Sequence, residues 1–322
     1  MREINSLALP DLYAVLSQTG LVRRVIELAR DEDLAPPAGF SGPLAGLRGD
    51  ITSMACPLDT RSRSALLMSR GPGVACGLAA AEEVLEVLAP ECRFGTTKRD
   101  GAEMYPGEQI GEITGPIRQI LTAERTLLNL VGRLSGVATR TRRFLEAMSG
   151  SLGATQAKLF DTRKTTPGLR MLEKYAVRCG GGYCHRIGLF DAVLIKDNHI
   201  AHLKPEELPG FVRSAAASAA SIAGGRLAFV EVEVDSLNQL EALLTLQPGV
   251  VDIILLDNMK PESLRQAVAI RNRLGRKPEL EASGGVTLDT IAEIAETGVD
   301  RISVGSLTHG AVSLDVGLDI EP

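Results

Sequence analysis

FDTRKTTPGLRMLEKYAVRCGGGYCHRIGLFDAVLIKDNH, residues 160–199, holds two short apolar strands with basic residues at their ends. Arg163 and Lys164 follow the first strand, Arg186 follows a triple glycine, and Lys196 ends the second strand, AVLIK. The chain as a whole is acidic, with a formal net charge of -5. Cations at strand ends and glycine-rich turns indicate an anion site, because arginine offers a bidentate fork and lysine a point charge. We therefore expect a small substrate that carries several carboxylates or phosphates.

The same stretch contains further basic residues, namely Arg170, Lys174, Arg178 and His185, but between residues 163 and 196 only Glu173 and Asp191 are acidic. A solvated basic face of one helix is the simplest alternative explanation. The cations near the strand ends are not on one helix, which favours the anion site.

From residue 155 onward, short apolar runs alternate with helical segments. The runs are AKLF (157–160), AVLIK (192–196), FVEVEV (229–234), DIILLD (252–257), LEASGG (280–285) and RISVG (301–305). Repeated β-then-α units indicate a parallel sheet with right-handed crossovers. Six strands in series favour a closed or nearly closed barrel over a doubly wound sheet.

Local signals set the ends of the helices between these strands. Ser236 and Gln239 fit a capping box, Pro261 suits the first turn of a helix, and Gly298 stands where a helix would end.

The part before residue 155 has a different pattern. We expect an amphipathic helix over 11–33, a Pro- and Gly-rich loop over 34–49, an antiparallel α+β domain over 50–120 with one helix at 79–89, and a long helix over 123–148. Gly132 and Gly136 lie four residues apart in the long helix and would let another backbone pack closely.

Composition excludes several classes of function. Aromatic residues make up 3% of the chain, there is no tryptophan, and the pI is about 5.6, so we expect no nucleic-acid partner. No apolar run approaches the roughly 18 residues needed to cross a bilayer, and the N-terminus lacks a signal-peptide pattern, so we expect no membrane partner. Five cysteines without a CxxC motif indicate free thiols rather than disulfides or zinc, and hence a cytoplasmic protein.

Polar residues stand at the carboxyl end of each expected strand, where a (β/α) barrel builds its active site. In chain order they are Arg163 and Lys164; Lys196, Asp197 and Asn198; Glu231 and Glu233; Asp257 and Asn258; Ser283, Gly284 and Gly285; and Gly305 and Ser306. Because Glu231 and Glu233 alternate with valine, both side chains should point to the same face of the sheet.

The last two turns, SGGV and VGSLTH, indicate a phosphate site, because glycine-rich turns before helices present backbone N–H groups. Glu233 and Asp257 could then bind ribose hydroxyls, a magnesium ion, or both.

With these residues in place, the chain resembles the quinolinate phosphoribosyltransferase family, also called nicotinate-nucleotide pyrophosphorylase (carboxylating). The matching stretches are GDITS (49–53), ERTLLNLVGRLSGVAT (124–139), DTRKTTPGLRMLEKYAVRCGGG (161–182), HRIGLFDAVLIKDNHI (185–200), VEVEVDSLNQL (230–240), DIILLDNM (252–259), LEASGGVTLDTIAEIAETGVDRISVGSLTH (280–309) and LDVGLDI (314–320). They cover nearly the whole chain in order.

The resemblance implies an N-terminal α/β sandwich domain (1–122), an open (β/α) barrel with the catalytic site (123–310) and a C-terminal tail (311–322) that returns to the first domain. It also implies that quinolinate and 5-phosphoribosyl-1-pyrophosphate react, with magnesium, to nicotinate mononucleotide, pyrophosphate and carbon dioxide in NAD biosynthesis.

Carried over by position, the resemblance implies three groups of site residues. Quinolinate would meet Arg163, Lys164, His185, Arg186, Lys196 and, from the other subunit of a homodimer, Arg125. The phosphoribosyl group would meet Glu233, Asp257, Ser283, Gly284, Gly285, Gly305 and Ser306. Lys164, Glu233 and Asp257 would be catalytic, and the two carboxylates would hold the magnesium directly or indirectly.

Two features depart from the family pattern. The family usually has asparagine before the His-Arg pair, where this chain has Cys184, and the segment 34–48 is longer than expected. A cysteine hydrogen-bonds weakly where an amide would hold the neighbouring loop.

Three other functions fit parts of the sequence. They are a paralogue of the same fold, associated with molybdate transport, acting on another acidic acceptor; a barrel that only binds nucleotides as a sensor; and an aldolase with Lys196 as a Schiff base. The intact DTRK, HR and KDNH motifs argue against the paralogue, and borohydride trapping would reveal the Schiff base.

Overall fold

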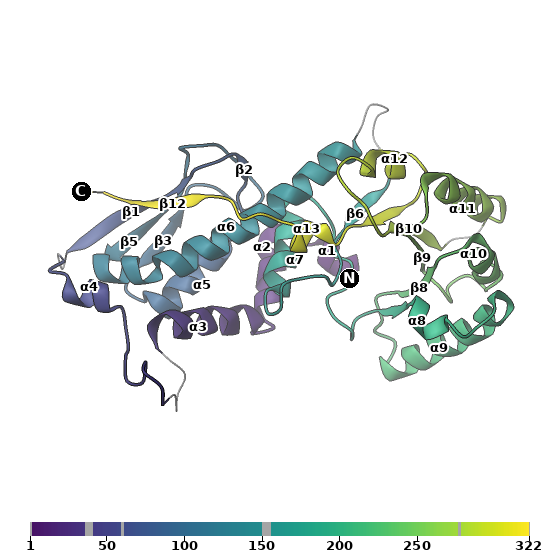
Figure 1. The fold of residues 1–322 in the computed structure, drawn as a ribbon, viewed down its shortest axis with the longest axis horizontal. Helices are drawn as coiled ribbons and strands as arrows, with labels where there is room; N and C mark the ends of the chain where they lie inside the picture. Colours follow the sequence, from purple (N-terminus) through teal and green to yellow (C-terminus); the bar gives the residue numbers. More distant parts are fainter. Residues whose placement is uncertain (1, 36–40, 59–60, 150–155, 276–277, 322) are drawn as a thin grey trace. The chain divides into compact units, whose positions relative to one another are not determined.

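The computed structural model describes residues 2–35, 41–58, 61–149, 156–275 and 278–321 (Figure 1). They form two compact units that interleave along the chain. The barrel unit comprises the described residues of 2–6, 143–164 and 182–306, and the sandwich unit those of 7–142, 165–181 and 307–321. No helix among the described residues is long and apolar enough to cross a membrane. All five cysteines are free thiols, as predicted.

The sandwich unit is built on an antiparallel sheet in the order β12-β1-β5-β3. The strands are β12 (Val316–Ile320), β1 (Ser62–Ser69), β5 (Gln109–Pro116) and β3 (Arg93–Thr96), and a separate pair joins β2 (Gly73–Val74) to β4 (Glu103–Met104). Ala65 of β1 is paired with Ile320 of β12, so the end of the chain forms an edge strand of this sheet.

Helices complete this unit (Figure 1). They are α2 (Leu9–Ser17), α3 (Leu21–Leu34), α4 (Ile51–Ala55), α5 (Leu78–Leu88), α6 (Ile117–Met148) up to residue 142, α7 (Arg170–Cys179) and, from residue 307, α13 (Ser306–His309). The single helix predicted over 11–33 is wrong: the chain turns at Gly20, whose φ of 71° is left-handed, and a second helix starts there.

Two other expectations for this part need comment. The long helix begins at Ile117, directly after β5, rather than at residue 123. Of the loop predicted over 34–49, residues 36–40 lie outside the described residues, and the described remainder holds turns after α3 ends.

The glycine pair in α6 does permit a close backbone approach. A Cβ at Gly132 would meet the carbonyl oxygen of Leu314, and one at Gly136 would meet that of Val312. The Leu314 N–H donates to the Gly132 carbonyl at 2.9 Å. The segment that leads into β12 therefore lies directly on α6.

The barrel unit is a six-stranded parallel sheet in the order β6-β11-β10-β9-β8-β7. The strands are β6 (Lys158–Phe160), β7 (Val193–Ile195), β8 (Val230–Val234), β9 (Ile253–Asp257), β10 (Glu279–Ser283) and β11 (Arg301–Ser303). The first strand of this unit, β6, pairs with its last strand, β11, so the sheet wraps into a barrel that is open between β6 and β7. The predicted fold class is confirmed.

Helices follow the strands on the outside of this barrel (Figure 1). The unit's helices are α1 (Arg2–Ser6), α8 (Asp197–Ile200), the 3-10 helix η1 (Pro205–Glu207), α9 (Leu208–Ile222), α10 (Leu237–Leu243), α11 (Pro261–Arg273) and α12 (Ile291–Ala295). Pro261 begins α11, and Gly298 follows α12 with a φ of 85°, as predicted. The capping box is wrong in detail, because Gln239 Oε1 accepts from the Asp235 N–H and the Ser236 side chain does not cap.

Candidate active site at the carboxyl ends of the barrel strands

An irregular segment beside β6 brings the two basic motifs together. The Tyr183 N–H donates to the Leu159 carbonyl at 2.8 Å, and the Asp161 N–H donates to the Tyr183 carbonyl at 3.0 Å. The buried Asp161 carboxylate accepts from the His185 N–H at 2.7 Å. This pairing runs parallel to β6 and sets the loop after Asp161, which carries Arg163, beside the His185 segment.

Arg163 and Arg186 lie close enough to repel each other. Burial lowers the pKa of Arg186, and the charge of Arg163 lowers it further. The Arg186 guanidinium donates from Nη1 to the Ala192 carbonyl at 3.2 Å, which fixes its position. Two neighbouring guanidinium groups favour a ligand with two negative charges.

Lys196 lies beside a carboxylate. It follows β7 and caps α8, where its backbone N–H donates to His199 Nδ1 at 2.9 Å. Its ammonium Nζ lies 3.4 Å from Oε2 of Glu233, which projects from β8. A cation predicted to bind the acceptor and a carboxylate predicted to bind the ribose therefore meet at one edge.

The ends of β9 and β10 are tied together next to this pair. Asn258 has a φ of 53°, and its N–H donates to the Ser283 carbonyl at 2.8 Å. Its amide Nδ2 donates to Asp257 Oδ2 at 2.7 Å. The Asp257 carboxylate is thus held in one orientation at the carboxyl end of β9.

The glycine turns differ from each other. Gly284 has a φ of 92°, and a Cβ there would collide with the Asn258 side chain. Gly285 has a φ of 62°, and the next helix, α12, follows after a further turn and begins at Ile291. Gly305, in contrast, leads straight into α13 at Ser306.

Of the sequence-predicted site residues, those at the carboxyl strand ends share one edge of the barrel. These are Arg163, Lys164, Lys196, Glu233, Asp257, Ser283, Gly284, Gly285, Gly305 and Ser306, while Arg186, in the segment before β7, lies near Arg163. Arg170, Lys174 and Arg178 belong to α7 of the sandwich unit, and Lys174 is fully buried. Arg125 also belongs to the sandwich unit, and its side chain is 69% exposed.

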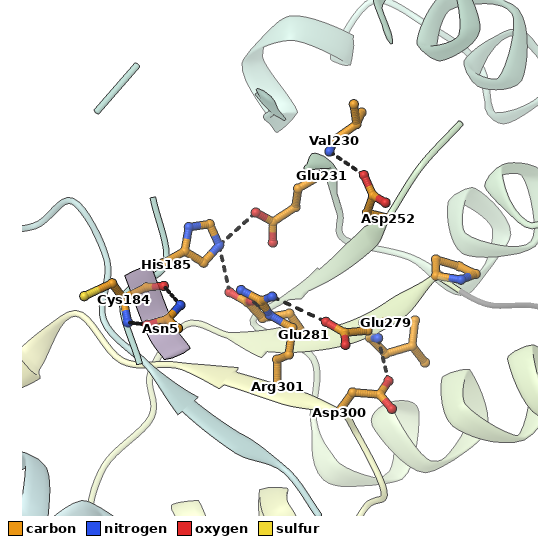
Figure 2. A network of polar contacts seen from close by, with 12 residues as sticks. Asn5, Cys184, His185, Val230, Glu231, Asp252, Glu279, Glu281, Asp300 and Arg301 are labelled. Atoms are coloured by element: carbon orange, nitrogen blue, oxygen red, sulfur yellow. Dashed lines mark hydrogen bonds and ion pairs between the residues drawn. The ribbon is translucent and has the colours of Figure 1, made fainter. Parts of the chain in front are cut away.

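His185 lies in the buried polar interior of the barrel (Figure 2). Its Nε2 is 2.8 Å from Glu231 Oε2 and 3.4 Å from Glu281 Oε1, although neither contact has the alignment of a hydrogen bond. Arg301 donates from Nε to Glu281 Oε2 at 2.6 Å. Sequence reasoning missed Glu281 and Arg301, although an acidic residue inside LEASGG and a basic one opening RISVG were the available signals.

A cavity of about 800 Å³ lies at the opposite, amino end of the strands. Its walls include Lys158, Ile253, Glu279 and Arg301, which open or nearly open their strands. Of the predicted site residues, only His185 reaches it. Since barrel active sites form at the carboxyl ends, we assign the chemistry to the carboxyl edge and not to this cavity.

The structure shows what holds the loop at Cys184, where the family usually has asparagine. Asn5 of α1 donates from Nδ2 to the Cys184 carbonyl at 2.9 Å, and its Oδ1 accepts from the Cys184 N–H at 2.8 Å (Figure 2). An amide does hold this loop, but it comes from the N-terminal helix, which sequence spacing could not reveal.

The fold and this edge define an α/β-barrel enzyme for anionic substrates. Residues 50–135 match the family model "Quinolinate phosphoribosyl transferase, N-terminal domain", and residues 137–319 match the corresponding C-terminal domain. The chain belongs to the quinolinate phosphoribosyltransferase family.

The names of similar proteins agree with this assignment. The chain is 41% identical over 273 residues to the nicotinate-nucleotide pyrophosphorylase [carboxylating] of Mycobacterium leprae, covering 84% of this chain and 91% of that one. It is 39% identical over 272 residues to the probable nicotinate-nucleotide pyrophosphorylase [carboxylating] of Bacillus subtilis, covering 84% and 88%. The solved structure of the nicotinate-nucleotide pyrophosphorylase from Francisella tularensis superposes with a TM-score of 0.78 at 34% identity, covering 99% of each chain.

Proposed function

We propose that this protein transfers the phosphoribosyl group of 5-phosphoribosyl-1-pyrophosphate to quinolinate and releases nicotinate mononucleotide, pyrophosphate and carbon dioxide, as a step of NAD biosynthesis in the cytoplasm. The observation that carries the proposal is the 3.4 Å contact between Lys196 and Glu233. It places a cation suited to a pyridine dicarboxylate against a carboxylate suited to a ribose, as the joining of the two substrates requires.

The basic side of the edge would hold quinolinate. Arg163 and Arg186 repel each other in the free protein, and a dicarboxylate would relieve that repulsion. Lys164, Lys196 and His185 would add charge around the same ligand. Fixing both carboxylates orients the ring nitrogen, so the protein contributes by positioning.

The other side would hold the phosphoribosyl group. Glu233 and Asp257 would accept hydrogen bonds from ribose hydroxyls and stabilise the positive charge that develops on the ring as pyrophosphate leaves. Ser283, Gly284, Gly285, Gly305 and Ser306 would bind the 5-phosphate through backbone N–H groups and hydroxyls.

The residues present suit a magnesium ion shared with the substrate. Glu233 and Asp257 offer carboxylate oxygens, and magnesium commonly takes one or two carboxylates together with substrate phosphates. When bound, the ion would neutralise charge on the departing pyrophosphate.

In the reaction, the ring nitrogen forms a bond to the anomeric carbon while the bond to pyrophosphate breaks. The resulting pyridinium accepts the electron pair released when the 2-carboxylate leaves as carbon dioxide, and that ring carbon then takes up a proton. On this account decarboxylation needs little more than the geometry held by the cations, so Lys164→Ala removes binding and transfer together. A variant that released a ribosylated product still carrying both carboxylates would contradict it.

A homodimer would complete the site. Arg125 is exposed, with Glu124 as its ion-pair partner, and is available to a second subunit. Mixing the variants Arg125→Ala and Lys196→Met tests this: half of the dimers would be mixed, and one of their two sites would be intact. Activity should return to roughly a quarter of the wild-type value. Subunit exchange between the two variants is verified first. If activity still does not recover, Arg125 does not belong to the partner's site.

The deciding experiment is to supply 5-phosphoribosyl-1-pyrophosphate and magnesium with either quinolinate or nicotinate and to measure nicotinate mononucleotide and carbon dioxide. We expect product from quinolinate, with one carbon dioxide for each mononucleotide. Product from nicotinate alone, or none from a folded protein, would refute the proposal.

A further inference from the structure

Four ionisable side chains lie close together in the interior of the barrel. They are His185, Glu231, Glu281 and Arg301 (Figure 2). All four residues are buried, and Glu231 and Glu281 are fully inaccessible. Glu281 and Arg301 are register partners on β10 and β11, and Glu231 projects from β8. Charges in such an interior persist only when they compensate one another.

The geometry determines which atoms carry protons. His185 Nε2 faces the carboxylates of both Glu231 and Glu281. A lone pair at Nε2 would repel both, so this nitrogen carries hydrogen. Two carboxylates and one guanidinium leave one negative charge over, and an imidazolium at His185 makes the group neutral.

We propose that Glu231, Glu281 and Arg301 form a positioning network that keeps His185 oriented and positively charged next to Arg186, its chain neighbour in the proposed quinolinate site. The role assigned to His185 rests on the proposed function. Glu231 and Glu281 approach the ring from two strands, while Phe160 and Phe229 meet it edge to face at centroid distances of 6.4 and 5.2 Å. The ring is therefore enclosed by groups that permit one orientation.

Arg301 acts through Glu281. Its guanidinium carbon lies 3.7 Å from the centre of the Phe160 ring, and its Nε contacts Glu281 at 2.6 Å. Glu279, on the outer side, comes within 3.4 Å of Arg301 Nη1. This arrangement holds the Glu281 carboxylate toward His185 and keeps it ionised.

The pKa shifts of His185 and Glu281 agree with a positively charged His185. Burial lowers the pKa of His185, but the charges of Glu231 and Glu281 outweigh burial and raise it to about 10. Burial raises the pKa of Glu281. The charges of His185 and Arg301 and a hydrogen bond from the Ser303 hydroxyl outweigh burial, and they lower this pKa to about 2. Arg186 also feels the Glu231 charge.

A metal ion is the competing occupant, because one atom each from His185, Glu231 and Glu281 lie within 4.8 Å of one another. The guanidinium of Arg301 already supplies a cation to Glu281. A divalent ion would sit next to that guanidinium and leave the group with excess positive charge, so the structure favours the imidazolium.

The test is a pH titration of the histidine side chains by ¹⁵N NMR on the full-length protein. The chain has four histidines, so comparison with His185→Gln assigns the His185 signals. We expect both ring nitrogens of His185 to stay protonated at pH 8. In Glu231→Gln and Glu281→Gln the titration midpoint should fall by roughly one to three pH units.

Kinetics provide the second readout. In the same two variants the KM for quinolinate, measured above the lowered titration midpoint of His185, should rise about tenfold, the effect of losing one charge-assisted contact, with the KM for 5-phosphoribosyl-1-pyrophosphate unchanged. Arg301→Lys, which keeps the positive charge, should raise the KM for quinolinate less than Arg301→Met does. The matched control is Glu279→Gln, since Glu279 is 53% exposed and contacts Arg301 but not His185.

Two results would overturn the network. One is a wild-type His185 that titrates near pH 6.5, a measurement that needs no variant to fold. The other is a stoichiometric metal found by elemental analysis whose removal restores ordinary titration. Because the NMR titration uses no substrate, an intact network in a protein that does not turn over quinolinate would count against the proposed function alone.

Discussion

Lys196 Nζ and Glu233 Oε2 lie 3.4 Å apart, one at the end of β7 and the other on the neighbouring strand β8. Parallel pairing of these strands, with Leu194 opposite Glu231, fixes their separation. The contact links the basic and acidic sides of the candidate site, and disrupting either partner should affect a different substrate.

Replacing Lys196 with methionine should raise the KM for quinolinate and lower kcat/KM by roughly ten- to a hundredfold, because a charge-assisted contact to a carboxylate is lost. Glu233→Gln should instead lower kcat, since the carboxylate acts on charge that develops during transfer. Steady-state kinetics with each substrate varied separates the two. Lys204→Met, an exposed lysine in the loop after α8, is the control, and equal losses in it would contradict a specific role for Lys196.

Gly284→Ala should weaken the site for the phosphoribosyl donor. The left-handed φ of 92° disfavours any Cβ, and the new methyl would collide with Asn258, which orients Asp257. We expect kcat/KM for 5-phosphoribosyl-1-pyrophosphate to fall roughly ten- to a hundredfold. Gly249→Ala has a similar φ of 89° with nothing within 4 Å, so it should lose stability without losing activity.

Asn5→Ala should destabilise the barrel unit by about 2 kcal/mol, because the buried backbone N–H and carbonyl of Cys184 lose their partner. Urea unfolding measures the change. Cys184→Ala retains both backbone contacts and should cost about 1 kcal/mol or less. If the two variants lose the same stability, the Asn5 amide does not hold this loop.

Arg133→Met should destabilise the sandwich unit strongly, although the Arg133 side chain is 20% exposed. Arg133 pairs with the fully buried Glu173 at 2.6 Å and donates to the carbonyls of Thr308 and Ala311, both at 2.7 Å. Removing it leaves a buried carboxylate uncompensated, a loss of about 3 kcal/mol or more.

Thermal or urea unfolding tests that value. The control is Arg23→Ala, because Arg23 also forms ion pairs, with Glu27 and Glu86, but each of these three side chains is at least 42% exposed. The free energy of unfolding of Arg23→Ala should stay within about 0.5 kcal/mol of the wild-type value. A small effect of Arg133→Met would mean that Glu173 becomes solvated.

The stability of the protein should depend on pH through His185 and Glu281. His185 has a folded pKa of about 10 against 6.5, so its contribution is complete below pH 6.5 and is lost as the pH rises toward 10. Glu281 has a folded pKa of about 2 against 4.5, so its contribution is complete above pH 4.5 and is lost as the pH falls toward 2.

The measurement is the free energy of unfolding between pH 6.5 and 10 for the wild type and for His185→Gln. We expect the decline to be steeper in the wild type. Parallel curves would show that His185 is not charged in the folded protein.

The sequence determined the architecture of the barrel and the edge that carries the chemistry. Apolar runs such as DIILLD and FVEVEV are short, are separated by helical segments and end in polar residues, and chain order in a β/α series dictates which strand ends share a face. For that reason Lys196, Glu233, Asp257 and Gly284 could be placed at one edge from the chain alone.

Only the tertiary structure decided which distant residues become partners. Asn5 holds Cys184 from 179 positions away, and His185 meets Glu231 and Glu281 because three separate segments bring their side chains into one interior. Sequence patterns report periodicity along a single element, whereas these contacts depend on strand register and on side-chain direction across elements. Lys174 illustrates the same point, because it is close to the basic motif in sequence and yet belongs to α7 of the sandwich unit, where it is fully buried.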